Sequence, residues 1–306
     1  MSAESQTAEE FETHRPRMFG LAYRMLGSAA EAEDAVQDAY LRWSGADREH
    51  IGQPAAWLAK VVTNLCLNRL TSARARRERY PGPWLPEPVV TEDAVLGPTE
   101  AAERRDAVSM ALLVLLERLT PTERAVYVLR EAFAYSHREI AGVLDVSEAN
   151  SRQLHRRAAA RVASAESRFT ERDERRHREL VEAFVAAARE GDLAALERTL
   201  AADVVWISDG GGVVSSARRP IEGRDKVVRF LGGLLKSDVN ALRMEWAELN
   251  GAPALLGWSG STLAAVASFV VRDGAIAVVH NLLNPEKLAV LERRLSHSGD
   301  SAGSYR

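Results

Sequence analysis

The spacing of apolar residues changes once along this chain of 306 residues, and the change limits the folds that it can adopt. Up to about residue 170 the sequence predicts helices only, because helix-start signals such as Thr120 with Glu123 recur. In such a pair the hydroxyl accepts a hydrogen bond from a free backbone N–H of the first turn, and the carboxylate accepts one from the backbone N–H of the capping residue. After about residue 200, short apolar runs are separated by the turn dipeptides Asn250-Gly251 and Asp273-Gly274. An all-helical part therefore precedes an α+β part built on one curved sheet.

The predicted elements follow this division. The helical part is predicted to contain helices near residues 8–27, 29–43, 54–79, 99–118, 121–133, 137–144 and 148–168. The α+β part is predicted to contain helices at 174–189, shortly after residue 192 and at 224–236, and strands at 204–207, 241–248, 254–258, 264–271 and 275–280. No internal repeat is visible.

A proline-rich segment at residues 80–88 separates two groups of the predicted helices, since four of its nine residues are proline. Proline cannot donate to a helix ladder and biases the preceding residue toward extended geometry. The segment is therefore predicted to be a stiff linker between two helical modules. Trp84 and Leu85 are unusual in a solvated linker, and two interpretations stay open: local packing onto the nearest helix, or docking into another domain.

Composition and charge exclude several classes of protein. The formal net charge is −3, so any binding of nucleic acid must rest on local positive charge. The single cysteine, Cys66, excludes a disulfide framework, and its apolar neighbours predict a buried, inert thiol. The acidic N-terminal residues are unlike a signal peptide, and there is no apolar run of about 18 residues that would predict a membrane span. We expect a soluble, cytoplasmic protein with no metal, no cofactor and no membrane partner.

Positive charge is concentrated in two segments. Residues 69–79 contain five arginines and one acidic residue, and they continue a predicted helix that carries Asn64 and Asn68. Residues 148–161 contain four arginines and one acidic residue, Glu148. Clustered guanidinium groups suit contacts to phosphate and to guanine, although any one such run is more often a solvated helix face.

The second arginine cluster lies in a helix-turn-helix pattern. A capped helix at 136–144 is followed by a tight turn at 145–147 and by a second helix at 148–161, which in such a motif lies in the major groove. The predicted apolar seam consists of Ile140, Leu144, Val146 and Leu154. The predicted exposed face consists of Ser151, Arg152, His155 and Arg156, flanked by Gln153 and Arg157.

A third feature is an acidic helix at residues 31–43. Its polar positions include Glu33, Asp34, Gln37 and Asp38. A solvated acidic face is common on helices, and the alternative is a dock for a basic partner surface.

Together these segments resemble the extracytoplasmic-function (ECF) sigma factors of bacterial RNA polymerase, over residues 10–165. Residues 31–43 resemble region 2.2, which implies that the four polar residues named above bind the β′ clamp helices of the core enzyme. Residues 54–69 resemble regions 2.3 and 2.4, which open and read the −10 element. The residues assigned to this element are Asn64, Asn68, Arg69, Arg74, Arg76 and Arg77. Trp57 is interpreted as a core residue rather than as a stacking platform for a flipped base.

Residues 119–162 resemble region 4, which implies contact with the β flap and recognition of the −35 element. The residues assigned to that element are Ser151, Arg152, Gln153, His155, Arg156 and Arg157. Promoter DNA and core polymerase are therefore the expected partners.

Three further motifs resemble the SigJ-like branch of this family, in which a SnoaL-like domain is fused to the sigma modules. They are Trp84-Leu85-Pro86-Glu87-Pro88, Asp209-Gly210-Gly211-Gly212 and Asn284-Pro285-Glu286-Lys287-Leu288. The resemblance implies an NTF2-like cone that regulates sigma activity in cis, and it leaves open a small-molecule ligand in the pocket of the cone. Val213 stands where other members have a basic residue, and Asn68 where an acidic residue is usual.

The expected fold is therefore multidomain, with two all-α sigma modules followed by an α+β NTF2-like cone. The expected domains are region 2 at 8–79, a linker at 80–98, region 4 at 99–168, the SnoaL-like domain at 174–290 and a flexible tail at 291–306. The expected function is promoter recognition and transcription initiation, without catalysis by this chain itself.

Two other functions remain as alternatives. An enzyme or ligand sensor fused to a DNA-binding module would use Asp203, Asp209 or His280 for acid–base chemistry in the cone. A plain repressor would need only the helix-turn-helix, and the acidic helix and the −10-type helix argue against it.

Overall fold

The computed structural model describes residues 3–77, 80–90, 109–166, 174–234 and 242–299. The chain divides into two compact units, of which the first comprises Met1–Glu78 with Thr91–Ser164 and the second Arg79–Val90 with Ala165–Arg306.

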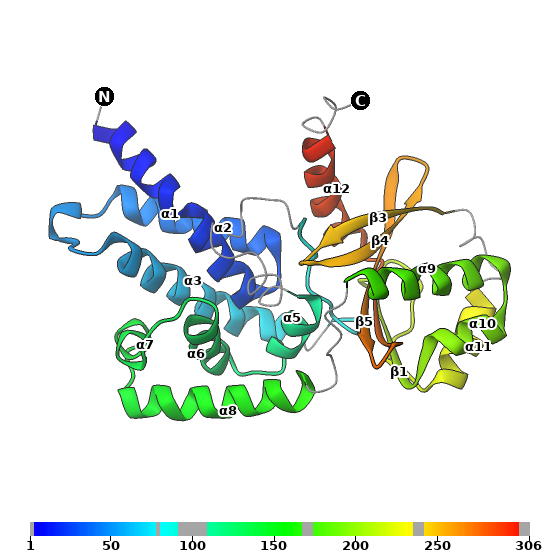
Figure 1. The fold of residues 1–306 in the computed structure, drawn as a ribbon. Coiled ribbons are helices and arrows are strands. Elements are labelled where there is room, and N and C mark those ends of the chain that lie inside the picture. Colours follow the sequence, from blue (N-terminus) through cyan, green and yellow to red (C-terminus); the bar gives the residue numbers. More distant parts are fainter. Residues whose placement is uncertain (1–2, 78–79, 91–108, 167–173, 235–241, 300–306) are drawn as a thin grey trace. The chain divides into compact units, whose positions relative to one another are not determined.

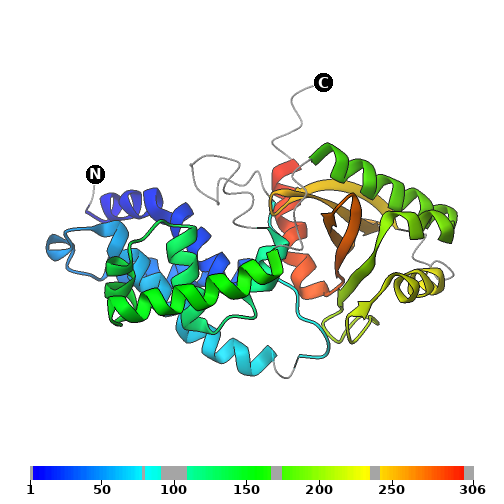
Figure 2. The ribbon, with the colours of Figure 1, turned by 60° about the horizontal axis from the view of Figure 1, so that its bottom comes forward.

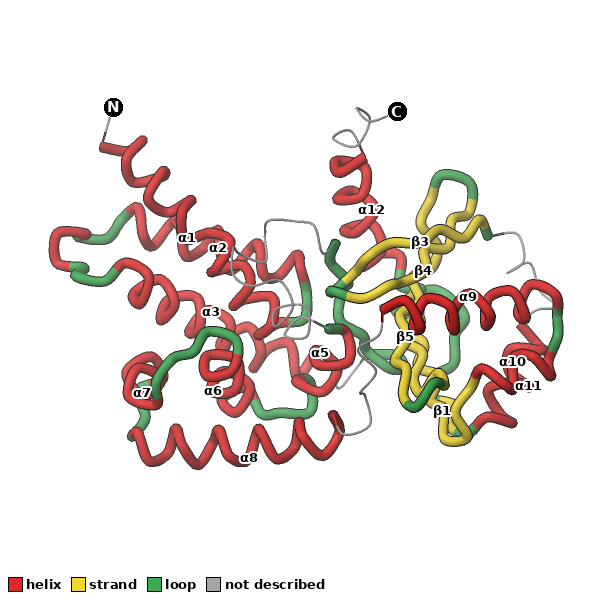
Figure 3. Tube along the Cα trace, viewed as in Figure 1, coloured by secondary structure: helices red, strands yellow, loops and turns green. Residues whose placement is uncertain are grey.

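The first unit is helical throughout the residues that the structure describes (Figures 1 and 3). Its elements are α1 (Ala3–Leu26), α2 (Ala29–Ser44), the 3₁₀ turn η1 (Arg48–His50), α3 (Pro54–Arg77), α5 (Met110–Leu116), α6 (Pro121–Glu131), α7 (His137–Leu144) and α8 (Glu148–Glu166). Helices α1, α2 and α3 pack together, while α6 and α7 pack against α3 and α6 also packs against α1.

The helix starts in this unit follow the capping signals of the sequence. Thr120 and Ser136 form complete capping boxes with Glu123 and Glu139 at the starts of α6 and α7. Helix α7 ends at Asp145, which adopts the left-handed conformation (φ 52°) that turns the chain into α8. The predicted helix-turn-helix geometry is thus present.

The second unit is built on one sheet of six strands in the order β2-β1-β6-β5-β4-β3. Figure 2 shows its arrows, coloured from yellow-green to orange, among the helices of this unit. The strands are β1 (Leu200–Asp209), β2 (Ile221–Glu222), β3 (Arg243–Leu249), β4 (Ala252–Ser259), β5 (Thr262–Arg272) and β6 (Ala275–Leu282). The helices are α9 (Glu174–Glu190), α10 (Leu193–Thr199), α11 (Arg224–Leu234) and α12 (Pro285–Gly299). Strands β1 and β6 are parallel, whereas the other neighbours are antiparallel.

Apolar side chains cover both faces of this sheet. On one face Trp206, Phe269 and Val279 form a buried cluster with side chains of α9, α10 and α11. Val266 and Leu282 are paired across β5 and β6 and, by the alternation of side chains along a strand, point to the opposite face, against which α12 packs. The face toward α9, α10 and α11 therefore carries the buried cluster of this unit.

The predicted division into a helical part and an α+β part is confirmed, and two details differ from expectation. Residues 291–299, expected to be part of a flexible tail, belong to α12. Residues 80–90, expected to be a linker between helical modules, group with the second unit. Of the helix predicted at 99–118, residues 99–108 lie outside the described residues.

Two expectations about chemistry can also be compared with the structure. Cys66 is fully buried, and burial raises the pKa of its thiol to about 12, as expected of an inert side chain. No helix in the described ranges combines the length and apolar character needed to cross a bilayer.

Candidate functional site

The segment of residues 80–90 is built into the second unit. Residues 85–90 are all buried, including Glu87 and two prolines. Val90 forms a bridge to Leu249 at the end of the edge strand β3, and Val89 exchanges two hydrogen bonds with Asn250. The expected docking of Trp84-Leu85 into another domain is therefore the interpretation that the packing favours.

A buried ion pair holds the start of this segment. The Asp209 carboxylate, which is completely buried, accepts hydrogen bonds from Lys287 Nζ (2.7 Å) and from the backbone N–H of Leu85 (2.9 Å). Lys287 Nζ also donates to the carbonyl of Leu85 (2.5 Å) and lies 4.1 Å from the ring centroid of Trp84. One acid and one base thus hold the same residue by both of its backbone polar groups.

Tyr80 and Asn284 extend this network. Tyr80 Oη donates to Asp209 Oδ1 (2.6 Å) and accepts from Asn284 Nδ2 (2.8 Å). Burial, followed by the hydrogen bond and charge of Asp209, raises the pKa of the Tyr80 hydroxyl. Tyr80 precedes the motif found in the sequence, and no local pattern marked it, because its partners lie more than a hundred positions away.

The topology explains why these groups meet. Parallel neighbours bring their carboxyl ends to the same edge of a sheet, and Asp209 at the end of β1 is paired with Leu282 at the end of β6. Asn284 and Lys287 follow within the next turn of chain. The three motifs identified in the sequence therefore converge on one place in the second unit.

Glycine is required in the loop after Asp209. Gly211 and Gly212 both have positive φ (63° and 76°). A Cβ at Gly211 would lie 2.5 Å from Asn284, and one at Gly212 would lie 2.4 Å from Pro81. Only glycine allows the loop to approach both the segment of residues 80–90 and the start of α12.

The three residues proposed for acid–base chemistry do not form a catalytic arrangement. Asp203 pairs with Arg272, and Asp209 is occupied by the network just described. His280 is buried, burial lowers its pKa to about 4, and its Nδ1 has no hydrogen-bond partner. A paired acid and base at contact distance is absent from this set.

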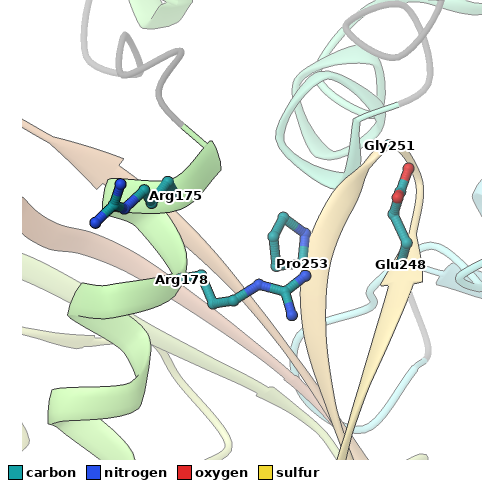
Figure 4. A pocket seen from close by; sticks show the side chains of 5 residues that line it. All are labelled: Arg175, Arg178, Glu248, Gly251 and Pro253. Carbon is teal, nitrogen blue, oxygen red and sulfur yellow. The ribbon is translucent and has the colours of Figure 1, made fainter.

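A cavity of about 300 Å³ lies between α9 and the β3–β4 hairpin. Its lining residues are Arg175, Arg178, Glu248, Gly251 and Pro253. Figure 4 shows the Arg178 side chain reaching toward Pro253, whereas Arg175 points away. The cavity contains charges of both signs, and none of the acid–base candidates lines it. Within the described ranges no cluster of three or more His, Cys, Asp or Glu side chains could hold a metal ion.

In the first unit, helix α8 presents only part of the predicted −35 face. Ser151 is completely buried and forms a hydrogen bond of 3.0 Å with His137 Nδ1, so its hydroxyl is not available to DNA. His155 is half-buried and lies 2.7 Å from a carboxylate oxygen of Glu131. These two contacts hold α8 against α7 and α6 of the same module.

The arginines of α8 differ in their pairing. Arg152 is paired with Glu148, and Arg157 lies 3.2 Å from Glu123. Arg156 and Gln153 are exposed, and within the described part of the chain Arg156 has neither an ion-pair nor a hydrogen-bond partner. Arg138 at the start of α7 is also exposed and without a partner in those ranges, a position that the helix-turn-helix prediction omitted.

Glu123 organises the base of this motif. Burial by itself raises the pKa of Glu123, but hydrogen bonds from Thr120 and the charges of two arginines of α8, Arg161 and Arg157, outweigh it and hold the pKa below its ordinary value. A charged, buried carboxylate thus ties the cap of α6 to α8.

The predicted −10 and polymerase-binding residues lie on adjacent helices. Arg69 on α3 donates to Asp38 (2.6 Å) and to the carbonyl of Glu31 on α2 (3.2 Å). Asn68 is exposed and Asn64 half-buried, while Arg74, Arg76 and Arg77 have side chains outside the described set. Trp57 packs against the buried Trp43 with a centroid distance of 5.7 Å, in keeping with a core role.

The predicted polymerase-binding face has one apolar member that the sequence reasoning missed. Glu33, Asp34 and Gln37 are exposed on α2, and Leu41 follows them one turn later with 60% of its surface exposed. A single exposed apolar side chain is common on protein surfaces, so Leu41 adds one apolar position to the predicted face and does not by itself identify it as a binding surface.

Comparison with known proteins covers both units. Residues 11–76 match the family described as Sigma-70 region 2, residues 109–162 match Sigma-70, region 4, and residues 181–279 match the SnoaL-like domain. The chain is 37% identical to the ECF RNA polymerase sigma factor SigJ of Mycobacterium tuberculosis, over 95% of this chain and 96% of that protein. It is 32% identical to the probable ECF sigma factor SigI of the same species, over 96% and 99%. The crystal structure of the M. tuberculosis SigJ superposes with a TM-score of 0.73, at 34% identity, over 92% of this chain and 98% of that one.

Proposed function

Because this chain belongs to the ECF sigma factors of RNA polymerase, we propose that it directs the core enzyme to promoters through its first unit and is regulated in cis by its second. The observation that carries the proposal is the order of region 2, region 4 and a SnoaL-like domain along one chain, shared with a relative over 95% of its length. A polymerase subunit works beside the chromosome, so the cytoplasmic location stays part of the proposal.

Promoter recognition at the −35 element is assigned to the exposed part of α8. Arg156 and Gln153 can reach base edges, since a free guanidinium suits the two acceptors of guanine. Arg152 exchanges its exposed glutamate partner for a phosphate, and Arg138 adds a phosphate contact from α7. Arg157 reaches a phosphate while Arg161 keeps its pair with the buried Glu123. Ser151 and His155 act as positioning residues, because their partners lie within the module.

Recognition at the −10 element is assigned to α3 beyond Asn64, with Asn68 at its exposed surface. The neighbouring face of α2 binds the core enzyme. Glu33, Asp34 and Gln37 supply charge and hydrogen bonds to a basic clamp surface, and Leu41 supplies the apolar contact. The β flap is the expected partner of the region 4 module.

Regulation is assigned to the Asp209–Lys287 pair. The pair binds the backbone of residues 80–90, which connect region 2 to region 4 in the sequence. A segment whose backbone is bound in this way cannot follow a path through the polymerase. The second unit therefore restrains the connection until the segment is released. We propose no catalysis by this unit, since its acid–base candidates do not converge, and a small-molecule ligand is not part of the proposal.

In vitro transcription with core polymerase tests this proposal. The full chain is compared with versions that end near residues 170 and 283, the second of which removes Asn284, Lys287 and the rest of α12. We expect promoter-dependent transcripts that change when the network is removed. Full-length Asp209→Asn serves as the point variant and Asp273→Asn, an exposed turn residue, as its control. The absence of a promoter-dependent transcript from every version contradicts the sigma function, and identical transcription from all of them contradicts the regulation.

A further inference from the structure

Two histidines hold helix α8 against the two helices that precede it. His137, the first residue of α7, bonds through Nδ1 to the hydroxyl of Ser151 (3.0 Å), whose side chain is completely buried. His155 Nε2 lies 2.7 Å from a carboxylate oxygen of Glu131 on α6, and its ring stacks with that of Tyr127. The two imidazole rings are neighbours, with centroids 5.5 Å apart. Each of the helices α6 and α7 therefore holds α8 through one titratable ring.

The two rings differ in their charged surroundings. A carboxylate at hydrogen-bond distance can balance a proton on His155, whereas the partner of His137 is a neutral hydroxyl. The charges that act on His137 from α6 and α8 are mostly positive: Arg130, Arg152 and His155, against Glu148. Helix α3 adds the positive charge of Lys60 at the other end of α7. A proton on His137 is therefore opposed by its neighbours.

The start of α7 also opposes a proton on His137. The free N–H groups of a first helical turn carry partial positive charge, and the acidic residue of this turn, Glu139, already forms the capping box with Ser136. Burial, followed by the charge of Arg130, holds the pKa of His137 below its ordinary value. The neutral ring therefore makes the bond to Ser151. The contribution of this bond is complete above about pH 6.5 and is lost as the pH falls below that value.

Loss of this bond frees α8 on one side only. A protonated His137 has to leave its place, so the buried Ser151 hydroxyl loses its partner, while His155 stays paired with α6. The exposed side chains of Gln153 and Arg156 follow these two anchors along α8 and move with the helix. Contacts to base edges carry the sequence information, whereas contacts to phosphates do not. Acid should therefore reduce the discrimination between sequences more than it reduces the affinity for DNA.

We infer that His137 is a positioning residue for −35 recognition, whose neutral ring fixes α8 through Ser151 and whose protonation releases the start of α8 and lowers sequence specificity. This inference rests on the proposed sigma function. It adds a proton-dependent step to that function, and none of the arginines assigned to DNA has to titrate.

The specificity of the holoenzyme as a function of pH tests this inference. A promoter duplex is selected from a random DNA pool by the full-length chain with core polymerase at about pH 7.5. The same duplex with a scrambled −35 element is the reference, and the ratio of the two affinities cancels the effects of pH on all other contacts. Attraction between protonated histidines and phosphates raises both affinities and leaves this ratio unchanged.

We expect the ratio to fall about three- to tenfold between about pH 7.5 and pH 5.5, because one unit of difference in the pKa of His137 between its positioned and released forms corresponds to tenfold. A ratio that is the same at both pH values overturns the inference and leaves the sigma function intact. A wild-type holoenzyme that selects no sequence at about pH 7.5 overturns the −35 assignment, and the inference with it.

Variants of His137 separate positioning from a merely structural role. His137→Ala should lower the ratio at both pH values, since the Ser151 hydroxyl loses its partner. His137→Gln can bond to Ser151 but cannot take up a proton, so it should restore most of the ratio without its pH dependence. His50→Gln, at a site in region 2 that is 82% exposed, is the matched control and should follow the wild-type profile. A wild-type profile in His137→Gln overturns the inference.

Arg130→Gln gives an independent measurement that leaves His137 in place. Among the charges that lower the pKa of His137, that of Arg130 is the largest, and glutamine keeps an N–H donor for the carbonyl of Tyr135. The pH at which the specificity ratio falls should therefore move upward. The shift should be less than about one pH unit, because Arg130 is exposed and solvent screens its charge. An unchanged or lower transition pH in Arg130→Gln overturns the inference.

Discussion

Charged groups have different roles in the two units: a buried pair fixes a backbone segment in the second, and an exposed pair lies on the surface of the first. In the second unit Asp209 and Lys287 are 0% and 8% exposed, and together they hold a backbone segment from both sides. On α8 in the first unit, Arg152 and Glu148 are 56% and 47% exposed and pair with each other across one helical turn. A buried pair cannot lose one member without stranding the other, whereas an exposed pair can exchange its partner for a phosphate at little cost. Burial thus separates the charges that fix structure from those that are available to DNA.

The largest expected effect is that of Lys287→Met in the full-length chain. It strands the buried Asp209 carboxylate and should destabilise the second unit by about 3–5 kcal/mol, measured by chemical denaturation. The segment of residues 80–90 should become sensitive to protease at the same time, because Leu85 loses a bond to its carbonyl. Lys226→Met, on the exposed surface of α11, is the control. A loss below about 1 kcal/mol would mean that the pair does not hold the segment.

Arg156→Ala tests the exposed charges of α8. Arg156 is exposed and has no partner in the described residues, so the proposed function makes it available to DNA, and its loss should weaken −35 recognition by about 1–3 kcal/mol. The measurement is the affinity of holoenzyme for its promoter at fixed salt, with a mutated −35 element as reference. Arg175→Ala removes an exposed arginine of the second unit that is paired with Glu179, and it should leave this affinity unchanged. Equal losses for the two variants would contradict the assignment of α8.

The buried His280 should make the second unit sensitive to acid. Burial lowers its folded pKa to about 4, below its unfolded value of about 6.5, so the unfolded state binds the proton more readily between these values. Its contribution is fully present above about pH 6.5 and is lost as the pH falls, with about 2 kcal/mol gone at pH 5. Denaturation at pH 7 and pH 5 measures this loss in wild type and in His280→Gln. The same pH dependence in both proteins would rule out His280 as its source.

The sequence predicts well those features whose partners are close along the chain. Thr120 with Glu123 and Ser136 with Glu139 are three residues apart, and both capping boxes form. The helix-turn-helix follows from the same local signals. The motif around Asn284 also contains a local helix signal, since Asn-Pro followed by Leu288 and Leu291 starts an amphipathic helix, and this helix continues beyond residue 290, where a flexible tail is expected.

Local signals cannot predict where residues 80–90 bind. Their partners, Asp209, Asn250 and Lys287, are between 124 and 202 positions away. Four prolines predict an extended linker, and this local pattern is the same whether or not another domain covers the segment. Likewise, helical spacing placed Ser151 on the reading face of α8, and only the position of His137 in the neighbouring helix shows that its hydroxyl points inward.

Glu148→Gln has the smallest expected effect, and it still tests whether an exposed charge pair is available to DNA or fixes structure. The Glu148–Arg152 pair is exposed on both sides, so its loss should alter stability by less than about 0.5 kcal/mol. Promoter affinity should rise instead of falling, because Arg152 no longer has to leave a carboxylate before it meets a phosphate. An i,i+4 pair contributes about 0.3–0.5 kcal/mol, which corresponds to a gain of at most about twofold at low salt that fades as salt screens the pair. Titrations of holoenzyme on promoter DNA at several salt concentrations measure it. A fall in affinity would show that Glu148 positions Arg152 for DNA, and that this exposed pair belongs with the structural charges.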